Sequence, residues 1–346
     1  MDYRIEKGSN KLRFGGRIIY RDEEAVLGYN GSFMEFLMEG TDVALRIRTG
    51  DNAIVNEPGL RIYVDNKPYK DMVISKMDGR YSVVSGLEAG KHLVRIVKIT
   101  EAAMSFVAFS LLEIENATGE PGTLLDIDTL YIKDTRKKAL FIGDSITCGF
   151  GVLGEPVSEY TIRDEDSELS YAGVLTQKEN LNSEWVSVSG YGVFVEYTGD
   201  PENILPKVFP YTNYFYDKEL REDYSRFQPD IVIVNLGTND SGPLMADKNV
   251  LYGFKSRYES FLYTLRMAYK EAAIVCVLGT LAPGVYKYVQ EVIDKVQAQG
   301  FEKIYGLELP EHDVKNDGMA AEHPSKITHE KDADRIAAFL KKEGLL

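Results

Sequence analysis

Along the first 133 residues, short runs of alternating apolar and polar side chains are separated by clusters of turn residues. Residues 43–48 (VALRIR) place Val, Leu and Ile on one side and Ala and two Arg on the other, which is the period-two pattern of a strand buried on one face. Further β-rich runs occupy residues 92–100 and 104–114, and no convincing helical pattern occurs in this part of the chain. Several strands at intervals of about ten to fifteen residues predict a β-sandwich.

From residue 134 onward, apolar runs alternate with amphipathic segments. Five runs have the composition of buried strands, at residues 139–145, 184–190, 229–240, 272–280 and 303–309. Helices are predicted between them and at the end of the chain, at residues 170–180, 254–268, 288–299 and 328–342. Apolar strands alternating with helices predict a parallel sheet covered on both faces. We therefore expect two domains, a β-sandwich at residues 1–133 and a three-layer α/β domain at residues 134–346.

Composition and charge narrow the class of partner. Hydrophobic residues make up 44 % of the chain and charged residues 27 %, which is ordinary for a globular protein and excludes a disordered or fibrous chain. The chain carries 40 Lys and Arg against 54 Asp and Glu, a formal net charge of −14. Because nucleic acids and anionic lipids attract basic side chains, we expect no nucleic-acid partner and no membrane partner. A neutral or weakly charged substrate fits this balance best.

The distribution of apolar stretches in the sequence bears on where the protein is located in or outside the cell. The N-terminus has no apolar run of signal-peptide length, and no apolar stretch of about 18 residues occurs anywhere in the sequence. We therefore expect a cytoplasmic protein, or a secreted one if a leader has been removed. The sequence carries no signal for the oligomeric state.

The cysteines and most of the histidines indicate neither a disulfide scaffold nor a metal site. Cys148 and Cys276 are the two cysteines, and we expect two reduced, mostly buried thiols, with one disulfide as the alternative. His329 is expected at the surface in the first turn of the last helix, and a role as a metal ligand is the alternative. No HExxH motif or cysteine cluster accompanies it, so we predict no metal and no cofactor. His92 and His312 are predicted to be structural.

Small polar residues follow three of the predicted strands. They lie at residues 143–145 (GDS), 189–190 (SG) and 237–240 (GTND), and His323 comes shortly before the last helix. Because ligands of open α/β sheets bind at the carboxyl ends of strands, we expect these pieces to meet at one edge of the sheet. Together they offer a serine hydroxyl, an imidazole, a backbone N–H and a side-chain amide. Acyl transfer needs this set, a hydroxyl deprotonated by a base and donors for the developing oxyanion.

Each of these residues also has an ordinary structural interpretation. Ser145 is a possible helix N-cap, Gly190 a plain strand-to-loop glycine, and Asn239 with Asp240 an Asx-type turn. The joint occurrence of the pieces at predicted strand ends favours the catalytic interpretation.

Four blocks in this order, GDSIT, SGYG, GTND and HP, resemble those of the SGNH (GDSL-like) hydrolase superfamily. The longer string GDSITCGFGV, with a β-domain before it and HPSKITHEKDADRIAAFL after it, resembles carbohydrate esterase family 2 more specifically. The motif resemblance covers residues 139–341, and the N-terminal half is similar only in its layout. It implies a jelly-roll-like β-sandwich followed by an SGNH hydrolase domain.

The resemblance also implies an activity and a set of site residues. Ser145 corresponds to the nucleophile and His323 to the general base, while the backbone N–H groups of Ser145 and Gly190 and the amide of Asn239 correspond to the oxyanion hole. The implied enzyme is a serine ester hydrolase, an O-acetyl esterase that acts on acetylated manno- or xylo-oligosaccharides from plant polysaccharides. An SGNH lipase or thioesterase on acyl chains, and a non-catalytic carbohydrate-binding protein, are the alternatives.

The sequence departs from the family pattern just before the histidine. Most SGNH enzymes have an Asp three residues before it, where this chain has Ala320, and the Asp-Trp pair frequent in family 2 is replaced by Ala321 and Glu322. The resemblance implies a Ser–His dyad in which a backbone carbonyl orients the imidazole. We predict that a carbonyl just upstream of His323 accepts this hydrogen bond, with the carboxylates of Glu322 and Asp317 as alternatives.

Tyrosines are the candidates for a sugar platform, because the chain has 22 Tyr and a single Trp. Tyr191 adjoins the candidate oxyanion glycine, and Tyr211, Tyr214, Phe215 and Tyr216 form a dense aromatic segment whose alternative role is the packed core of a loop. The β-domain either binds sugar itself or only shapes the cleft, and we favour the second role because no trio of surface aromatic residues is evident.

Overall fold

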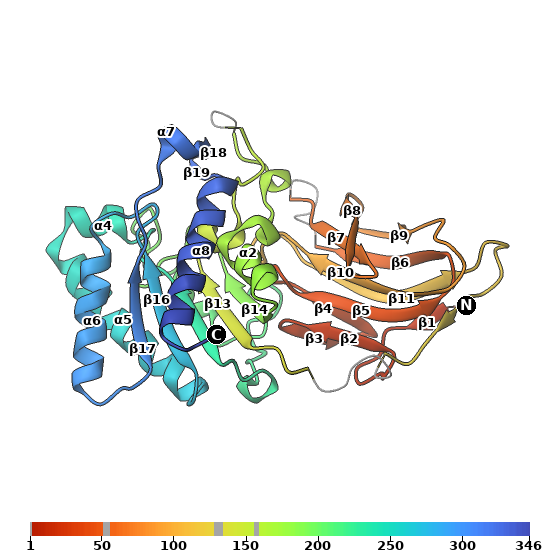
Figure 1. Ribbon diagram of the computed structural model, residues 1–346, viewed down its shortest axis with the longest axis horizontal. Coiled ribbons are helices and arrows are strands. Elements are labelled where there is room, and N and C mark those ends of the chain that lie inside the picture. Colours follow the sequence, from red (N-terminus) through yellow and green to blue (C-terminus); the bar gives the residue numbers. More distant parts are fainter. Residues whose placement is uncertain (1, 51–55, 128–133, 156–158) are drawn as a thin grey trace. The chain divides into compact units, whose positions relative to one another are not determined.

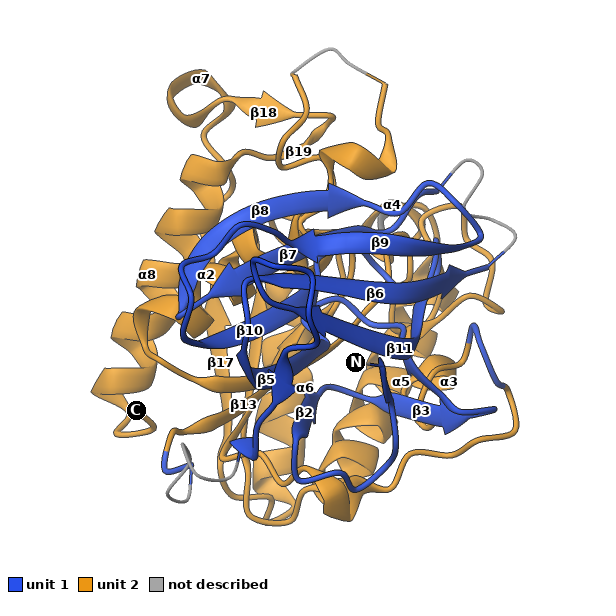
Figure 2. Cartoon of the chain, turned by 90° about the vertical axis from the view of Figure 1, so that its right-hand side faces the viewer, with its two compact units in different colours: residues 1–135, 215–217 blue, residues 136–214, 218–346 orange. Residues whose placement is uncertain are grey.

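The computed structural model describes residues 2–50, 56–127, 134–155 and 159–346 (Figure 1). The chain forms two compact units, one of residues Met1–Thr135 with Phe215–Asp217 and the other of Arg136–Tyr214 with Lys218–Leu346 (Figure 2). The domain boundary expected after residue 133 lies outside the described residues.

The first unit consists of two antiparallel sheets. One sheet has the strand order β3-β4-β11-β6-β9, with β1 also paired to β11, and the other has the order β12-β5-β10-β7-β8, with β2 also paired to β5. Their bounds are β1 Asp2–Arg4, β2 Leu12–Gly15, β3 Ile18–Arg21, β4 Glu24–Leu27, β5 Phe33–Glu39, β6 Asp42–Thr49, β7 Gly59–Val64, β8 Lys67–Val73, β9 Asp78–Val84, β10 Lys91–Lys98, β11 Val107–Glu115 and β12 Thr123–Leu124. The β-sandwich predicted from the alternating pattern is confirmed.

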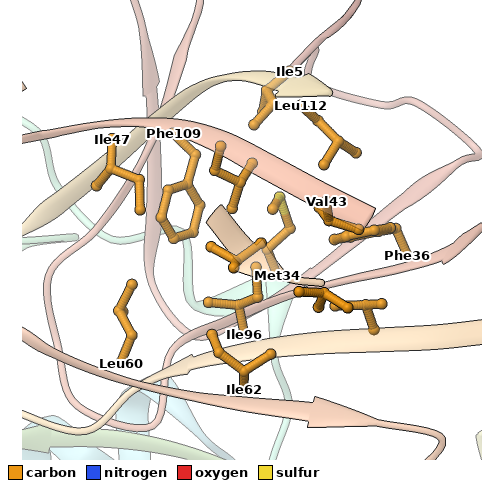
Figure 3. Packing of buried hydrophobic residues seen from close by; sticks show 14 of the residues in the cluster. Ile5, Met34, Phe36, Val43, Ile47, Leu60, Ile62, Ile96, Phe109 and Leu112 are labelled. Carbon is orange, nitrogen blue, oxygen red and sulfur yellow. The ribbon is translucent and has the colours of Figure 1, made fainter. Parts of the chain in front are cut away.

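The core of this unit lies between the two sheets. Val43 and Ile47 of β6 are buried, and they face Met34 of β5 and Ile62 of β7 from the other sheet (Figure 3). Arg46, one position out of phase with these two, is exposed, because successive side chains of a strand point to opposite faces. The period-two pattern of the sequence therefore corresponds directly to the inner and outer faces of the sandwich.

The second unit is built around one parallel sheet with the strand order β14-β13-β15-β16-β17. Its strands are β13 Lys138–Gly143, β14 Asn182–Ser187, β15 Ile231–Asn235, β16 Ala273–Leu278 and β17 Ile304–Glu308. Its longer helices are α2 Tyr171–Lys178, α5 Lys248–Ala268, α6 Tyr286–Ala298 and α8 Lys326–Lys342, and its short ones are α1 Ser145–Cys148, α3 Leu205–Val208, α4 Ser241–Ala246 and α7 Val314–Asp317. A two-stranded hairpin, β18 Met319–Ala320 and β19 His323–Pro324, precedes α8.

Helices cover both faces of the parallel sheet. Helices α2 and α8 pack together on one face of the sheet (Figure 1). Their buried side chains form one cluster with Phe141, Ile233 and Val275 of the sheet, which point to the same face. Cys276, the neighbour of Val275, points to the opposite face and lies against Tyr258 of α5, which packs with α6. The predicted three-layer arrangement is confirmed.

No helix in the part of the chain that the structure describes is both long and apolar enough to cross a membrane.

Candidate active site

Ser145 lies where strand β13 turns into the one-turn helix α1. Asp144 is the N-cap of this helix, and its carboxylate accepts the backbone N–H of Ile146 at 3.0 Å. Ser145 is therefore the first helical residue and not the cap that the sequence left open as an alternative. Gly143 completes the tight turn, since a Cβ at this position would lie 1.9 Å from the hydroxyl oxygen of Thr147.

His323 reaches the serine from the β18–β19 hairpin, 178 residues later in the chain. Its Nε2 lies 2.8 Å from Ser145 Oγ, and its Nδ1 lies 3.1 Å from the carbonyl oxygen of Ala321. Because a carbonyl only accepts hydrogen bonds, Nδ1 carries the proton and Nε2 accepts the bond from the Ser145 hydroxyl. This is the tautomer that a general base needs in order to remove the hydroxyl proton.

The carbonyl of Ala321 takes the place of an orienting carboxylate, as predicted. Asp317 forms an ion pair with Lys331, and its backbone carbonyl accepts the Ser325 hydroxyl at 2.6 Å. The prediction of a backbone acceptor just upstream of His323 is therefore confirmed.

Burial lowers the pKa of His323 below its usual value. The hydrogen bond to the Ala321 carbonyl and the charge of Glu322 oppose this shift, and the charge of His312 adds to it. The imidazole is therefore neutral and ready to accept a proton at neutral pH.

Gly190 and Asn239 are linked through the loop that follows strand β14. Gly190 has φ 79°, a left-handed conformation that favours glycine. The amide nitrogen of Asn239 donates to the carbonyl of Tyr191 at 3.1 Å, across 48 residues of sequence. The side chain of Asn239 therefore joins two strand ends, which differs from the Asx turn considered as its alternative role.

Asp240 fixes the same loop through hydrogen bonds to its backbone. Its buried carboxylate accepts the backbone N–H groups of Val193, Phe194 and Val195 at 2.8, 2.8 and 3.0 Å. Burial raises the pKa of Asp240, and the three backbone donors oppose that shift. This role of Asp240 was not predicted from the sequence, where its one signal is a carboxyl residue directly after a candidate oxyanion donor.

His329 is buried, so the expectation of a surface histidine was wrong. Only 1 % of its surface is exposed, and its Nδ1 accepts the backbone N–H of Tyr171 at 3.1 Å. Burial lowers its pKa to about 3. The spacing could have revealed this, since Ala333, Ile336 and Leu340 continue the same buried face of α8.

The surroundings of the two cysteines and of the two remaining histidines, His92 and His312, agree with structural roles. Cys148 and Cys276 are buried reduced cysteines, as expected. His92 lies in β10 with its Nδ1 2.8 Å from Asp65, and the backbone N–H of His312 donates to Thr280 at 3.0 Å. Within residues 2–50, 56–127, 134–155 and 159–346, no group of three or more His, Cys, Asp and Glu side chains is arranged to hold a metal ion.

An exposed aromatic ring lies beside Gly190, in the loop that follows β14. Tyr197 is 66 % exposed, and its ring lies 3.3 Å from where a Cβ of Gly190 would be. Other aromatic residues were the candidates for a sugar platform predicted from the sequence. Among them, Tyr191 is half-buried with its hydroxyl 3.3 Å from Asn203, and Tyr216 packs edge-to-face on Phe106 in the first unit.

Two family models match the chain. The model described as Carbohydrate esterase 2 N-terminal matches residues 14–120, and that of the GDSL-like Lipase/Acylhydrolase family matches residues 141–304.

Curated relatives and a solved structure extend the match over nearly the whole chain. The chain is 29 % identical over 337 residues to the cellulase/esterase CelE of Acetivibrio thermocellus, covering 95 % of this chain but only 39 % of that protein. It is 22 % identical over 315 residues to an acetylxylan esterase / glucomannan deacetylase of Cellvibrio japonicus, covering 89 % and 82 % of the two chains. A family two carbohydrate esterase from Clostridium thermocellum, solved in complex with cellohexaose, is 30 % identical with a TM-score of 0.85, covering 97 % of this chain and 100 % of that one.

Proposed function

Because the chain belongs to carbohydrate esterase family 2, we propose that it is a carbohydrate O-acetyl esterase that works through a serine acyl-enzyme. The substrates we propose are acetylated manno- or xylo-oligosaccharides derived from plant polysaccharides. The observation that carries the proposal is the 2.8 Å hydrogen bond between Ser145 Oγ and His323 Nε2, with the opposite ring nitrogen held by the Ala321 carbonyl.

In the first half-reaction, Ser145 Oγ attacks the carbonyl carbon of the acetyl group while His323 Nε2 removes the hydroxyl proton. The carbonyl oxygen becomes an oxyanion, to which the N–H groups of Ser145 and Gly190 and the amide of Asn239 donate. The carbon–oxygen bond to the sugar then breaks, and the imidazolium returns the proton to the departing sugar oxygen. The products are a free sugar hydroxyl and an acetylated Ser145.

In the second half-reaction, water replaces the sugar. His323 takes a proton from the water as its oxygen attacks the acetyl carbon, and the same donors stabilise the second oxyanion. The bond to Ser145 Oγ breaks, the imidazolium returns the proton to the serine, and acetic acid leaves as acetate. Both halves thus require a transient imidazolium.

The exposed ring of Tyr197 supports a sugar as the leaving group. An aromatic face offers an apolar surface to the C–H groups of a sugar ring, while its phenol can bond to hydroxyl groups. Tyr197 stands beside Gly190, so a sugar stacked on it would carry its acetyl group near the proposed oxyanion donors. A cytoplasmic location stays a prediction.

The test is acetate release from defined acetylated manno- and xylo-oligosaccharides, with 4-nitrophenyl acetate as a general substrate. Ser145→Ala should lower kcat by about 10⁴- to 10⁶-fold, because residues of a catalytic unit act together. Ser260→Ala, at an exposed serine of α5, is the control that should leave kcat unchanged.

Other outcomes would favour the alternatives. Faster hydrolysis of 4-nitrophenyl octanoate than of the acetate would indicate a lipase or thioesterase. Binding of the oligosaccharides without any Ser145-dependent hydrolysis would indicate a carbohydrate-binding protein. Either result contradicts the proposed function.

A further inference from the structure

The ring of Phe150 contacts two others, the imidazole of His323 and the phenol ring of Tyr160. These three rings are called the aromatic row below. The ring of Phe150 lies 4.5 Å from the His323 ring, centroid to centroid, at an interplanar angle of 40°. The ring of Tyr160 stacks on that of Phe150, with the two centroids 3.5 Å apart and an interplanar angle of 12°. His323 is half-buried in this environment.

Hydrogen bonds fix the positions of both Tyr160 and Phe150. The hydroxyl of Tyr160 donates to the carboxyl group of Glu165 at 2.9 Å, and Glu165 is 1 % exposed. The backbone N–H of Phe150 donates to the carbonyl of Ser145 at 3.0 Å. Phe150 is therefore tied by its backbone to the turn that carries the proposed nucleophile and touches the proposed base with its side chain.

The neighbouring backbone is equally constrained. Gly151, which follows Phe150, has φ 71°, and a Cβ there would lie 2.8 Å from the Cβ of Ala321 and 3.0 Å from the carbonyl oxygen of Ala320. The N–H of Ala321 donates to the carbonyl of Glu155 at 3.2 Å. The segment after Ser145 and the histidine hairpin therefore pack as one assembly, in which a change at Phe150 is transmitted to His323.

These contacts bear on the positive charge that forms on the imidazole of His323 during the proposed reaction. The Ala321 carbonyl fixes the tautomer but carries no full negative charge, so it stabilises an imidazolium less than a carboxylate would. The face of an aromatic ring is the negative end of a quadrupole and attracts a cation within about 6 Å of its centroid. Phe150 is within that range of His323.

We propose that Phe150, supported by Tyr160, is a positioning residue that fixes the plane of the His323 imidazole and stabilises its protonated form in both half-reactions. The inference rests on the proposed esterase function. In this enzyme the aromatic row supplies part of what an orienting aspartate supplies in a triad.

Other charges face His323 and enter the pH dependence. Glu322 favours the imidazolium of His323 and His312 disfavours it, while the charge of His323 disfavours protonation of His329. None of these groups changes when Phe150 is replaced, so a comparison of variants isolates the aromatic contribution.

The kinetic test compares Phe150→Leu with Phe150→Tyr. Leucine keeps an apolar side chain of similar bulk but has no quadrupole, so we expect kcat to fall by about 3- to 30-fold with little change in KM. The pKa of the acid limb of kcat/KM should fall by about half a unit to one unit, because the imidazolium loses stabilisation. Phe150→Tyr should restore most of kcat, and Tyr160→Leu should give a smaller loss than Phe150→Leu.

Phe339→Leu is the matched control. Phe339 of α8 is also half-buried and makes an edge-to-face pair with a tyrosine, Tyr305, at 6.4 Å. We expect its replacement to leave kcat and the acid-limb pKa unchanged. An unchanged kcat in Phe150→Leu, or a loss of kcat with an unchanged or raised pKa, would overturn the proposal, and so would an equal loss in Phe339→Leu.

A spectroscopic test separates this inference from the proposed function. In Ser145→Ala, the carbon-bound protons of the His323 ring should carry an upfield NMR shift from the ring current of Phe150, and Phe150→Leu should remove it. The chain has only four histidines, so His323→Asn assigns the signal. Identical His323 shifts with and without Phe150 would show that the contact is absent. Failure of the wild-type enzyme to hydrolyse any acetyl ester would instead overturn the function and leave the ring contact measurable.

Discussion

At the scale of the residue, the amide of Asn239 has one observed role, in the loop after β14, and one proposed role, in the oxyanion hole. One N–H donates to the Tyr191 carbonyl and fixes the loop, and the second can donate to the substrate oxyanion. Asn239→Ala should lower kcat by about 10²- to 10³-fold with a much smaller change in KM, because the oxyanion develops only in the transition state. Steady-state kinetics and a melting curve measure both effects. A lower Tm with an unchanged kcat would assign Asn239 to the loop alone.

The dyad can be tested at the two carboxylates nearest to His323 in sequence. The Nδ1 proton of His323 is already bonded to the Ala321 carbonyl, so Glu322→Gln and Asp317→Asn should each keep kcat within about tenfold of wild type, whereas loss of a true triad aspartate costs about 10⁴. Asp317→Asn should also lower the stability, because Asp317 is buried and pairs with Lys331. A fall in kcat to the level of Ser145→Ala, in a folded variant, would contradict the dyad.

At the scale of the element, the β18–β19 hairpin places the carbonyl that orients His323. Its two turn residues, Ala321 and Glu322, have φ 45° and 62°, so both lie in the left-handed region. Two-residue hairpin turns of this kind prefer Asn-Gly, and non-glycine residues in the left-handed region cost on the order of 1 kcal/mol. The hairpin therefore holds a strained turn at the position where Ala321 supplies the acceptor.

Two substitutions at Glu322 test this strain in opposite directions. Glu322→Gly should raise the free energy of unfolding by about 0.5–1 kcal/mol and keep most of the activity, since glycine adopts this conformation freely. Glu322→Val should lower both the stability and kcat, because a β-branched residue resists positive φ and shifts the Ala321 carbonyl. Chemical denaturation and kinetics of the pair measure this. Equal stabilities for the two variants would show that the turn is unstrained.

At the scale of the whole molecule, buried titratable groups make stability depend on pH. His329 has a folded-state pKa of about 3, far below its usual value, so the unfolded chain binds a proton that the folded chain resists. Its contribution is fully present above about pH 6.5 and is lost progressively as the pH falls from there towards 3. Asp144 has the opposite effect, because burial raises its pKa to about 7 and favours the folded state as the pH falls through that value.

Replacing His329 isolates its contribution. Asn is uncharged, and its side-chain oxygen can accept the Tyr171 N–H in place of Nδ1. Between pH 6.5 and pH 5, the free energy of unfolding of wild type should therefore fall by about 2 kcal/mol more than that of His329→Asn. This difference does not depend on the stability of the variant at pH 7. Urea denaturation at the two pH values gives this difference. Parallel pH profiles for the two proteins would contradict the assignment of the shift to His329.

The layers of both units and the candidate site residues follow from local patterns in the sequence. Alternation in residues 43–48 gave the sandwich strands because one face of each strand must be buried, and continuous apolar runs gave the parallel sheet because both of its faces are covered. Ser145, Gly190, Asn239 and His323 were recognisable because each lies at a fixed position in a short motif. The resemblance to family 2, with Ala320 at the position of the usual Asp, was enough to predict a carbonyl acceptor for His323.

The hydrogen-bond and packing partners of the buried polar residues depend on contacts between distant parts of the chain. The burial of His329 depends on Tyr171, 158 residues away, and the role of Asp240 depends on amides some 45 residues earlier in the chain. The contact of Phe150 with His323 requires the β18–β19 hairpin to pack against the segment that follows α1. A local pattern records which face of a strand or helix is apolar. It does not record which distant backbone group or ring fills the space opposite a polar side chain, because packing of the complete chain fixes that choice.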